Sequence, residues 1–173
     1  QGRIDVFFLG GVQIDGAANV NLLGLGPYPA LTKRFAGSFG SAFLYYVVPR
    51  VILYREEHSP RTLVERVDVV SAPGTSPPGV WRPGGPSHLL TGRALFAFDR
   101  DAARFRLTAY DPDETIAGVR ARTGFAFDVA DEVAAWPPPD AETERRLDEV
   151  VAPALAETYP AFARRTFPPS PSG

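Results

Sequence analysis

Two short and nearly continuous apolar runs limit the folds open to this chain. They are residues 4–9 (IDVFFL), closed by Gly10 and Gly11, and residues 50–55 (RVILYR). Strands that are covered on both faces of a parallel sheet have this pattern, because neither face alternates with polar residues. In open α/β sheets, ligands bind beyond the carboxyl ends of the strands. The runs therefore predict a parallel α/β sheet whose functional loops follow its strands.

The remaining segments predict an antiparallel extension and peripheral helices. Further strands are expected at residues 20–23, 67–71, 88–91, 94–99 and 104–109, the last three as a meander, and helices at 113–123 and 141–156; the run 43–48 fits either element. The expected fold is α/β, with an open, mostly parallel sheet, flanking helices, an antiparallel meander and a C-terminal helix. One domain is predicted over residues 1–156, followed by a Pro-rich tail at 157–173.

Composition excludes several classes of function. A net charge of −2 provides no basic field for nucleic acid, and the absence of Cys excludes thiol chemistry and disulfides. No apolar run approaches the roughly 20 residues that cross a bilayer, and no leader pattern is present, so we expect a cytoplasmic protein without membrane contact. The chain has no Met and begins at Gln1, close to an apolar strand. We therefore expect a processed or truncated chain whose N-terminal part is missing.

Three polar loops are candidates for a small-molecule site: residues 13–21, 37–41 and 56–59. Polar loops after strands have an ordinary structural explanation as well, and both interpretations stay open. Glu57 and His58 fit a general acid and base pair or a strand end with satisfied side chains. His88 lies in an apolar stretch and is expected to be structural. No cluster of His and carboxylates suggests a metal site.

Five segments resemble the beta subunits of class I coenzyme A transferases, the glutaconate type in particular. The first is FFLGGVQIDxxxNVN at 7–21, which is similar to the family's GGAQIDxxGNVN. The others are KRFAGSFGSA at 33–42, EHSPRTLVERVDVVSAPG at 57–74, LLTGRALFAFD at 89–99 and AYDPDETIAGVRARTGF at 109–125. They occur in the family's order, and the resemblance covers about residues 4–150.

The resemblance implies a beta subunit that pairs with an alpha subunit of the same fold in a hetero-oligomer. A glutamate of the beta subunit attacks an acyl-CoA, and CoA passes through a glutamyl-CoA thioester to a carboxylic acid. No cofactor is held permanently, since CoA thioester is the substrate, and no metal is implied. By position, the oxyanion loop comprises Gly37, Ser38 and Gly40. Contacts to the acyl-CoA are expected from Gln13, Asp15, Asn19, Asn21, Phe39, Ser41, Glu57 and His58.

The sequence departs from the family in ways that leave alternatives. The family's glutamate precedes residue 4, so no catalytic residue is expected within this chain, and Glu57 is not its substitute. Phe39 and Ala18 stand where the family has Gly, and a side chain at 39 hinders a close approach to the loop backbone. One alternative is an acyl-CoA hydrolase of the same fold, of the type that opens steroid rings. Another is a partner subunit without chemistry of its own.

Overall fold

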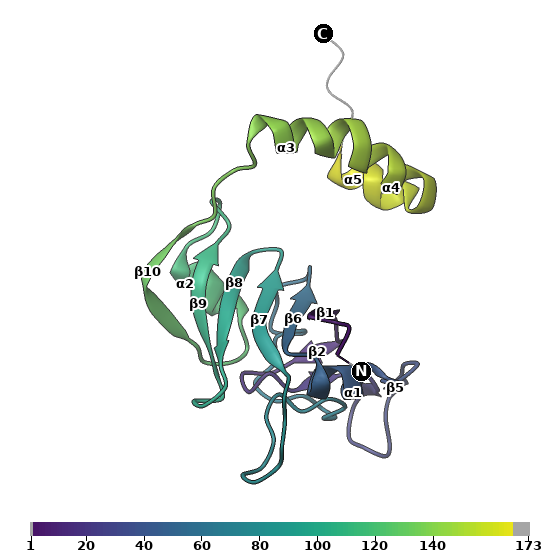
Figure 1. Cartoon of the computed structure of the whole chain (residues 1–173), viewed down its shortest axis with the longest axis vertical. Helices are drawn as coiled ribbons and strands as arrows, with labels where there is room; N and C mark the ends of the chain where they lie inside the picture. The colour runs from purple at the N-terminus through teal and green to yellow at the C-terminus, as the bar shows by residue number, and fades with distance from the viewer. Residues whose placement is uncertain (1, 168–173) are drawn as a thin grey trace. The chain divides into compact units, whose positions relative to one another are not determined.

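The chain forms two compact units, of which one ends at Trp136 and the other begins at Pro137. The computed structural model describes residues 2–167 (Figure 1).

A six-stranded sheet, in the order β1-β6-β7-β8-β9-β10, is the framework of the first unit. Its strands are β1 (Val6–Leu9), β6 (Arg50–Arg55), β7 (Pro86–Thr91), β8 (Ala94–Asp99), β9 (Arg104–Tyr110) and β10 (Asp128–Ala135). The first three run parallel, with Phe7 opposite Val51 and Leu53 opposite Leu89, and β10 runs parallel to β9. β7, β8 and β9 form an antiparallel meander. The predicted sheet and its antiparallel extension are confirmed.

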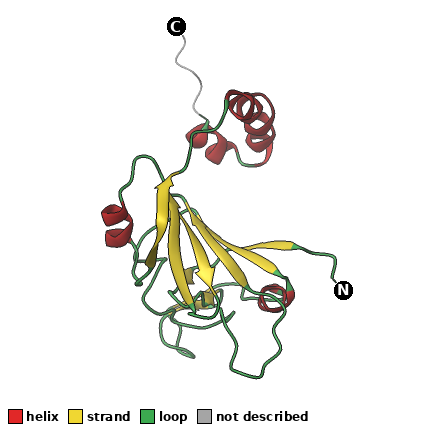
Figure 2. Cartoon of the chain, turned by 60° about the vertical axis from the view of Figure 1, so that its left-hand side comes forward, coloured by secondary structure: helices red, strands yellow, loops and turns green. Residues whose placement is uncertain are grey.

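Two helices flank this sheet (Figure 2). Residues 43–48, which fit either element in the sequence, lie mainly in α1 (Ser41–Val47), which buries Tyr45. Pro49 prevents continuation, because the residue before a proline favours extended backbone, and Val48 has ψ 127°. α2 (Ile116–Arg122) begins at Thr115, whose hydroxyl accepts a hydrogen bond from the Gly118 N–H.

Between β1 and α1 the chain makes two small antiparallel sheets. β2 (Gln13–Ile14) pairs with β3 (Val20–Asn21), and β4 (Gly24–Leu25) pairs with β5 (Lys33–Arg34). The strand expected at 20–23 is therefore present in shortened form.

The core lies on the inward positions of the parallel strands and the meander. Val51, Leu53 and Leu89 are fully buried there. An aromatic cluster joins the meander to the segment after α2, with Phe96 and Phe127 ring centroids 5.1 Å apart in an edge-on arrangement. Each such ring removes a large apolar area from water, so this cluster fixes the packing of β8 and β9 against residues 125–127.

The predicted strand at residues 67–71 is wrong. This segment is irregular, and its backbone bonds to the β2–β3 loop instead of to a ladder: the Asp68 N–H donates to Gln13 Oε1, and only Ala72 makes a bridge, to Val20. Val67 packs inward while Val70 is half exposed. A loop buried against a neighbouring loop therefore also carries the valines that favour a strand in the sequence.

The second unit is helical. It contains α3 (Ala141–Arg146), a π-helical turn η1 (Leu147–Val151), α4 (Ala152–Thr158) and α5 (Pro160–Thr166). Asp140 begins it by accepting a hydrogen bond from the Thr143 N–H at 2.8 Å. The helix predicted at 141–156 is thus present, but the predicted domain boundary after residue 156 falls inside α4, and α5 occupies part of the predicted tail. Residues 168–173 of that tail lie outside the described residues.

Candidate functional site

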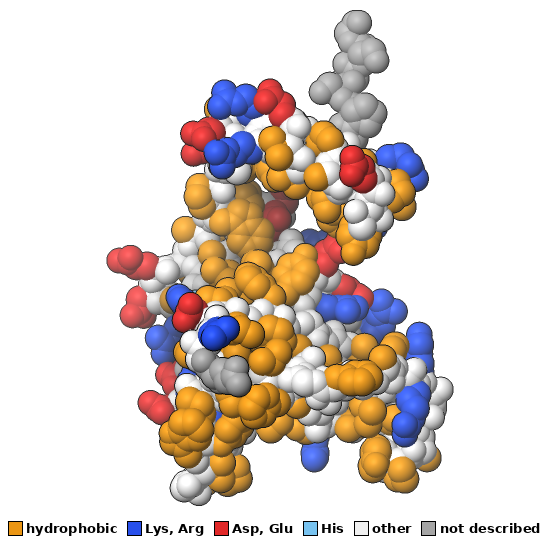
Figure 3. All heavy atoms as spheres, turned by 45° about the vertical axis from the view of Figure 1, so that its right-hand side comes forward, with side chains coloured by type: hydrophobic (Ala, Val, Ile, Leu, Met, Phe, Trp, Pro, Cys, Tyr) orange, Lys and Arg blue, Asp and Glu red, His pale blue; other side chains and the backbone are white. Residues whose placement is uncertain are grey.

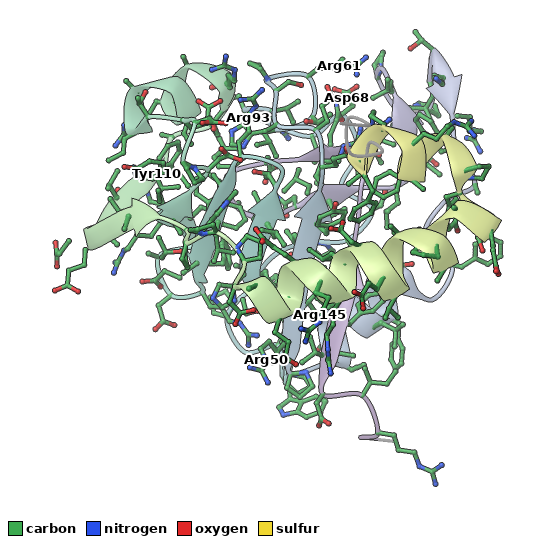
Figure 4. All side chains as sticks on the ribbon, turned by 90° about the horizontal axis from the view of Figure 1, so that it is seen from above. Arg50, Arg61, Asp68, Arg93, Tyr110 and Arg145 are labelled. Atoms are coloured by element: carbon green, nitrogen blue, oxygen red, sulfur yellow. The ribbon has the colours of Figure 1, made fainter. Side chains whose placement is uncertain are left out.

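A polar cavity lies at the carboxyl ends of the parallel strands, where the sequence predicted a site. Its volume is about 730 Å³, and it is lined by Gly10, Tyr54, Arg55, Glu56, Glu57, His58 and Arg93. Gly10 follows β1, residues 54–58 end and follow β6, and Arg93 follows β7. Figure 4 shows Arg61 and Arg93 at this end of the sheet and Arg50, the first residue of β6, at the other. The predicted loop 56–59 is therefore the part of the candidate set that meets this cavity.

Glu57 is held as a carboxylate by two arginines. Its Oε2 accepts from Arg55 Nη2 at 3.2 Å and from Arg61 Nη2 at 2.9 Å, while Oε1 accepts from the Ser59 hydroxyl at 2.7 Å. Hydrogen bonds from Arg61, then Ser59, lower the pKa of Glu57 to about 2. A carboxylate with this pKa is a weak base, so the general-base role is disfavoured. Its geometry is that of an anchor for the loop after β6.

His58 is buried at the wall of the cavity, with a threonine on each ring nitrogen. Nδ1 is 2.8 Å from the Thr91 hydroxyl, and Nε2 is 2.9 Å from the Thr123 hydroxyl. The Thr91 oxygen already accepts from the N–H groups of Arg93 and Ala94. The Thr91 hydroxyl has one proton, which can go to Nδ1 or to the Ala94 carbonyl 3.1 Å away; when it goes to Nδ1, Nε2 of the neutral ring donates to Thr123, and Thr123 donates to the Val119 carbonyl.

Burial and the charge of Arg93 stabilise that neutral form. Desolvation, and next the nearby Arg93, lower the pKa of His58 to about 4. With both nitrogens occupied and 6% of its surface exposed, His58 links β7 to the end of α2. The acid and base pair considered for Glu57 and His58 does not form, since the carboxylate faces arginines and the imidazole faces threonines.

The amides of the 13–21 loop bond to each other and to the backbone. Asn21 is fully buried; its Nδ2 donates to Gln13 Oε1 at 2.8 Å and to the Gly24 carbonyl at 2.7 Å, and its Oδ1 accepts from the Leu23 and Gly24 N–H groups. Asp15 accepts from the N–H groups of Ala17 and Asn19. Asn19 Oδ1 accepts from the Gly74 N–H at 3.1 Å. These side chains stabilise the loop, and none of them lines the polar cavity.

The 37–41 loop has the opposite character, because its backbone donors are free. Within residues 2–167, the N–H groups of residues 37–40 have no hydrogen-bond partner, whereas the Ser41 N–H donates to the Ser38 carbonyl at 2.7 Å. Gly37 has φ 92° and Phe39 has φ 40°, so the chain turns twice through left-handed conformations. The Phe39 side chain is 92% exposed. Ser38, Gly40 and Ser41 complete a partly exposed loop that leads into α1.

Sequence reasoning missed Arg55, Arg93 and the two threonines around His58. Arg55 appeared as the last residue of a strand, and its burial could not be inferred; its Nε is buried without a partner in the described chain, while Nη1 reaches the Gly11 carbonyl. Arg93 pairs with Glu114, which also lies 3.6 Å from Arg122. The contacts of Arg55 and Arg93 join residues that are far apart in the sequence. Within the described residues, no group of three or more His, Asp or Glu side chains could hold a metal ion, and no helix has the length and apolarity to span a bilayer.

The fold and the site together define an open-sheet α/β protein with its functional loops between strands. The chain is 31% identical over 158 residues to the beta subunit of glutaconate CoA-transferase from Acidaminococcus fermentans, a match that covers 87% of this chain and 58% of the relative. It is 29% identical over 138 residues to the beta subunit of 3-oxoadipate CoA-transferase from Pseudomonas knackmussii, covering 76% and 53%. No protein-family profile matches the chain.

Solved structures give the same result. The crystal structure of the Acidaminococcus glutaconate CoA-transferase superposes with a TM-score of 0.76 at 29% identity, over 87% of this chain and 60% of that one. The decarboxylase AibA/AibB superposes with a TM-score of 0.71 at 30% identity, over 83% of this chain and 56% of that one. IpdAB of Rhodococcus jostii RHA1 superposes with a TM-score of 0.74 at 27% identity, over 86% of this chain and 60% of that one.

The chain is therefore a homologue of the beta subunits of two class I coenzyme A transferases, and its fold matches the solved structure of one of them. It spans a little over half the length of the curated relatives that it matches. The family resemblance inferred from the five sequence segments is confirmed.

Proposed function

We propose that this chain forms part of the beta subunit of a coenzyme A transferase, which moves CoA from an acyl-CoA to a carboxylic acid. Homology to the beta subunits of two CoA-transferases supports the reaction class. The observation that carries the proposal is the run of backbone N–H groups at residues 37–40 that have no partner within the described chain. Unpaired donors on a preorganised loop stabilise an oxygen that gains negative charge.

Residues 37–40 would act on the thioester carbonyl. When a nucleophile adds to this carbon, the oxygen becomes an oxyanion, and N–H donors already fixed in position stabilise it without reorganisation. One lost oxyanion donor reduces kcat by about 10²–10³ in other enzymes. Gly37, at φ 92°, and Gly40 fit this role because neither places a side chain over the loop. Ser38 and Ser41 line the same turn.

The nucleophile in this proposal is a glutamate that precedes residue 4 in the family. Its carboxylate attacks the thioester, releasing CoA thiolate and leaving an acyl anhydride. The thiolate then attacks the glutamyl carbonyl, which releases the acid and forms glutamyl-CoA; the acceptor carboxylate repeats both steps in reverse. Glu57 does not fit this role, because its four hydrogen bonds and its low pKa oppose nucleophilic attack.

The remaining polar candidates fit binding roles of different kinds. Glu57 and His58 border the polar cavity, where Arg55 is paired with Glu57 and Arg93 with Glu114, so these side chains would orient a polar part of the substrate by hydrogen bonds. Gln13, Asp15, Asn19 and Asn21 would act indirectly, by fixing the loop that lies beside the acyl-CoA. No permanent cofactor is part of the proposal.

An alpha-type partner subunit fits the apolar surface near the start of β1. Phe8, Phe43 and Trp81 are 61%, 66% and 76% exposed. An apolar cavity of about 550 Å³ lies beside the last two, lined by residues 2–5, by α1 and by Trp81 and Pro83. Hydrophobic side chains cover much of the face seen in Figure 3. Extended apolar surface of this kind is typical of a protein interface.

Phe39 favours a second candidate. Its side chain projects from the middle of the free-donor loop, and its backbone takes a conformation that glycine prefers. A loop altered in this way fits a different reaction on the same fold, such as acyl-CoA hydrolysis with ring opening, or a partner subunit without chemistry. One solved relative of similar identity is a decarboxylase by name.

Covalent trapping tests the proposal. The natural protein, co-produced with its partner subunit, is incubated with a panel of acyl-CoAs and treated with hydroxylamine or borohydride, and its intact mass and peptides are measured. A modified glutamate upstream of residue 4 is expected. Turnover of a thioester without an adduct would replace the transferase by the hydrolase, and absence of turnover would favour a non-catalytic subunit. The Phe39→Gly variant in the same complex is the matched comparison: unchanged turnover means that Phe39 does not impair the loop.

A further inference from the structure

A small cavity at the amino ends of β6 and β7 combines two arginines with two hydroxyl groups. Its volume is about 180 Å³, and it is lined by Gly74, Thr75, Ser76, Val80, Arg82, Gly84 and Arg100. It lies at the end of the sheet that Arg50 marks in Figure 4, opposite the polar cavity described above. Neither the oxyanion loop nor residues 56–58 line it.

Both arginines are fixed by backbone carbonyls. Arg82 Nε donates to Gly84, Nη1 to Pro73 at 2.8 Å, and Nη2 to Tyr45 at 3.2 Å. Arg100 Nε donates to Pro86, and Nη2 donates to Pro49 at 2.8 Å and to Gly85 at 3.0 Å. The Arg82 guanidinium also lies over the Tyr45 ring, 5.3 Å from its centroid. The two cations are therefore held in place before any ligand arrives.

The positive charge at this cavity has no counter-charge. Neither arginine forms an ion pair within residues 2–167, although Arg55 and Arg93 of the polar cavity do. The two guanidinium groups repel each other: burial, and to a smaller extent Arg100, lower the pKa of Arg82. Asp15, an acid that acts on Tyr45 nearby, is engaged with the N–H groups of its own loop. An anion in the cavity would remove this repulsion.

Donors remain free to meet such an anion. Arg100 Nη1 has no partner within the described chain, and neither has the hydroxyl of Thr75; the Ser76 oxygen accepts from Arg82 and keeps its own proton. Guanidinium and hydroxyl groups in this combination are typical ligands of a phosphate oxygen. A cavity of 180 Å³ holds the volume of about six water molecules, enough for a tetrahedral oxyanion and too little for a nucleotide.

We propose that this cavity, between Arg82, Arg100, Thr75 and Ser76, is a binding site for a phosphate group. Its two possible sources are inorganic phosphate and a phosphate of coenzyme A, and the second rests on the function proposed above. The cavity adjoins the 13–21 loop, because Gly74 packs against the Ala17 and Ala18 backbone and donates to Asn19. A phosphate bound here would thus tie the 72–86 loop to the loop that carries the family's amide motif.

The test measures anion binding to the whole protein at low ionic strength, by titration calorimetry and by the shift of the melting temperature. Inorganic phosphate is expected to bind and to raise the melting temperature. The Arg100→Gln variant is expected to weaken this binding about tenfold, the loss of one charge-assisted hydrogen-bonding group. Arg104→Gln is the matched control, since Arg104 is an exposed arginine at the start of β9 that pairs with Asp128, and its affinity should equal that of the wild type.

Thr75→Val gives a second variant that leaves the arginine contacts intact, and it should weaken phosphate binding severalfold. Equal affinities for wild type, Arg100→Gln and Thr75→Val would overturn the site, as would absence of phosphate binding by the folded wild type. Coenzyme A and its 3′-dephospho form distinguish the sources. If Arg100→Gln weakens inorganic phosphate but neither CoA form, the site stands with free phosphate as its ligand. If the trapping experiment detects no transferase activity, the result for inorganic phosphate binding still stands.

Discussion

The Nδ2 of Asn21 donates a 2.8 Å hydrogen bond to Oε1 of Gln13, inside a strand pair that excludes solvent from Asn21 altogether. The same Gln13 oxygen accepts from the Asp68 N–H, which lies in another loop. Two polar residues that the family motif associates with acyl-CoA therefore form the internal joint between the β2–β3 hairpin and residues 67–68. Substitution of Gln13 or Asn21 should therefore first lower the stability of the protein.

Asn21→Ala should lower the free energy of unfolding by about 3 kcal/mol. The substitution leaves the Gly24 carbonyl and the Leu23 and Gly24 N–H groups without partners in a buried place, and each unsatisfied group costs about 1–3 kcal/mol. Urea denaturation of the purified protein measures it. An unchanged midpoint together with weaker acyl-CoA binding would contradict the structural role. Thr32→Val is a suitable control, because its hydroxyl makes a single exposed hydrogen bond to Leu25.

His58 should make the protein less stable in mild acid. Burial lowers its pKa to about 4 in the folded state, against an ordinary value of 6.5, so the unfolded chain binds more protons between these limits. The contribution is complete above pH 6.5 and is lost as the pH falls toward 4. After allowance for solvent screening, it amounts to about 2 kcal/mol.

Unfolding free energies measured from pH 7.5 to 4.5 test whether stability falls as the pH is lowered. The His58→Gln variant should show a flatter pH profile, because glutamine cannot titrate. His88, whose pKa burial also lowers, supplies the comparison variant His88→Gln. Glu57 affects the stability in a separate pH range, below its ordinary pKa of 4.5. A wild-type stability that rises as the pH is lowered from 6.5 to 5 would refute a neutral His58.

Phe39→Gly should raise the unfolding free energy by about 1 kcal/mol. Phe39 has φ 40°, where a side chain is strained by this order, and its 92% exposure means that little packing is lost. Phe39→Ala keeps the Cβ and is therefore the matched control, with no gain expected. Thermal denaturation of the three proteins compares them. A gain of the same size for alanine would assign the effect to the aromatic ring and not to the backbone.

Local patterns and distant contacts differ in how far a sequence reveals them. Residues 50–55 were predictable as a strand because the run is locally apolar, but the expected cover on both faces is wrong for the described residues: β6 buries Val51 and Leu53 and leaves Tyr54 46% exposed. The meander was predictable because its turns are local. The strand assigned to 67–71 failed because the Asp68 N–H bonds to the Gln13 side chain and the Ser71 N–H to the Val20 carbonyl, contacts that only the fold creates. For the same reason the family motif at residues 7–21 located the 13–21 loop, but it did not predict that the side chains of this loop bond to each other and to the backbone. Thr91 and Thr123 leave no signal, since only the fold brings them to His58.

Gly74→Ala should be among the most damaging small substitutions in the chain. A Cβ at this position would lie 2.1 Å from the Ala17 carbonyl oxygen and 2.7 Å from the Ala18 carbonyl carbon, and both are backbone atoms that cannot rotate away. The 72–86 loop would have to move off the 13–21 loop, losing the Gly74 to Asn19 hydrogen bond. Such overpacking costs about 3 kcal/mol. Gly40→Ala is the matched control, because no atom lies within 4 Å of the added methyl group and φ is −80°. Equal stability of the two variants in urea would mean that the loops are not in this close contact. If Gly74→Ala alone is destabilised and Asn19→Ala shows part of the same loss, the packing of these two loops is what holds the family's amide motif in its conformation.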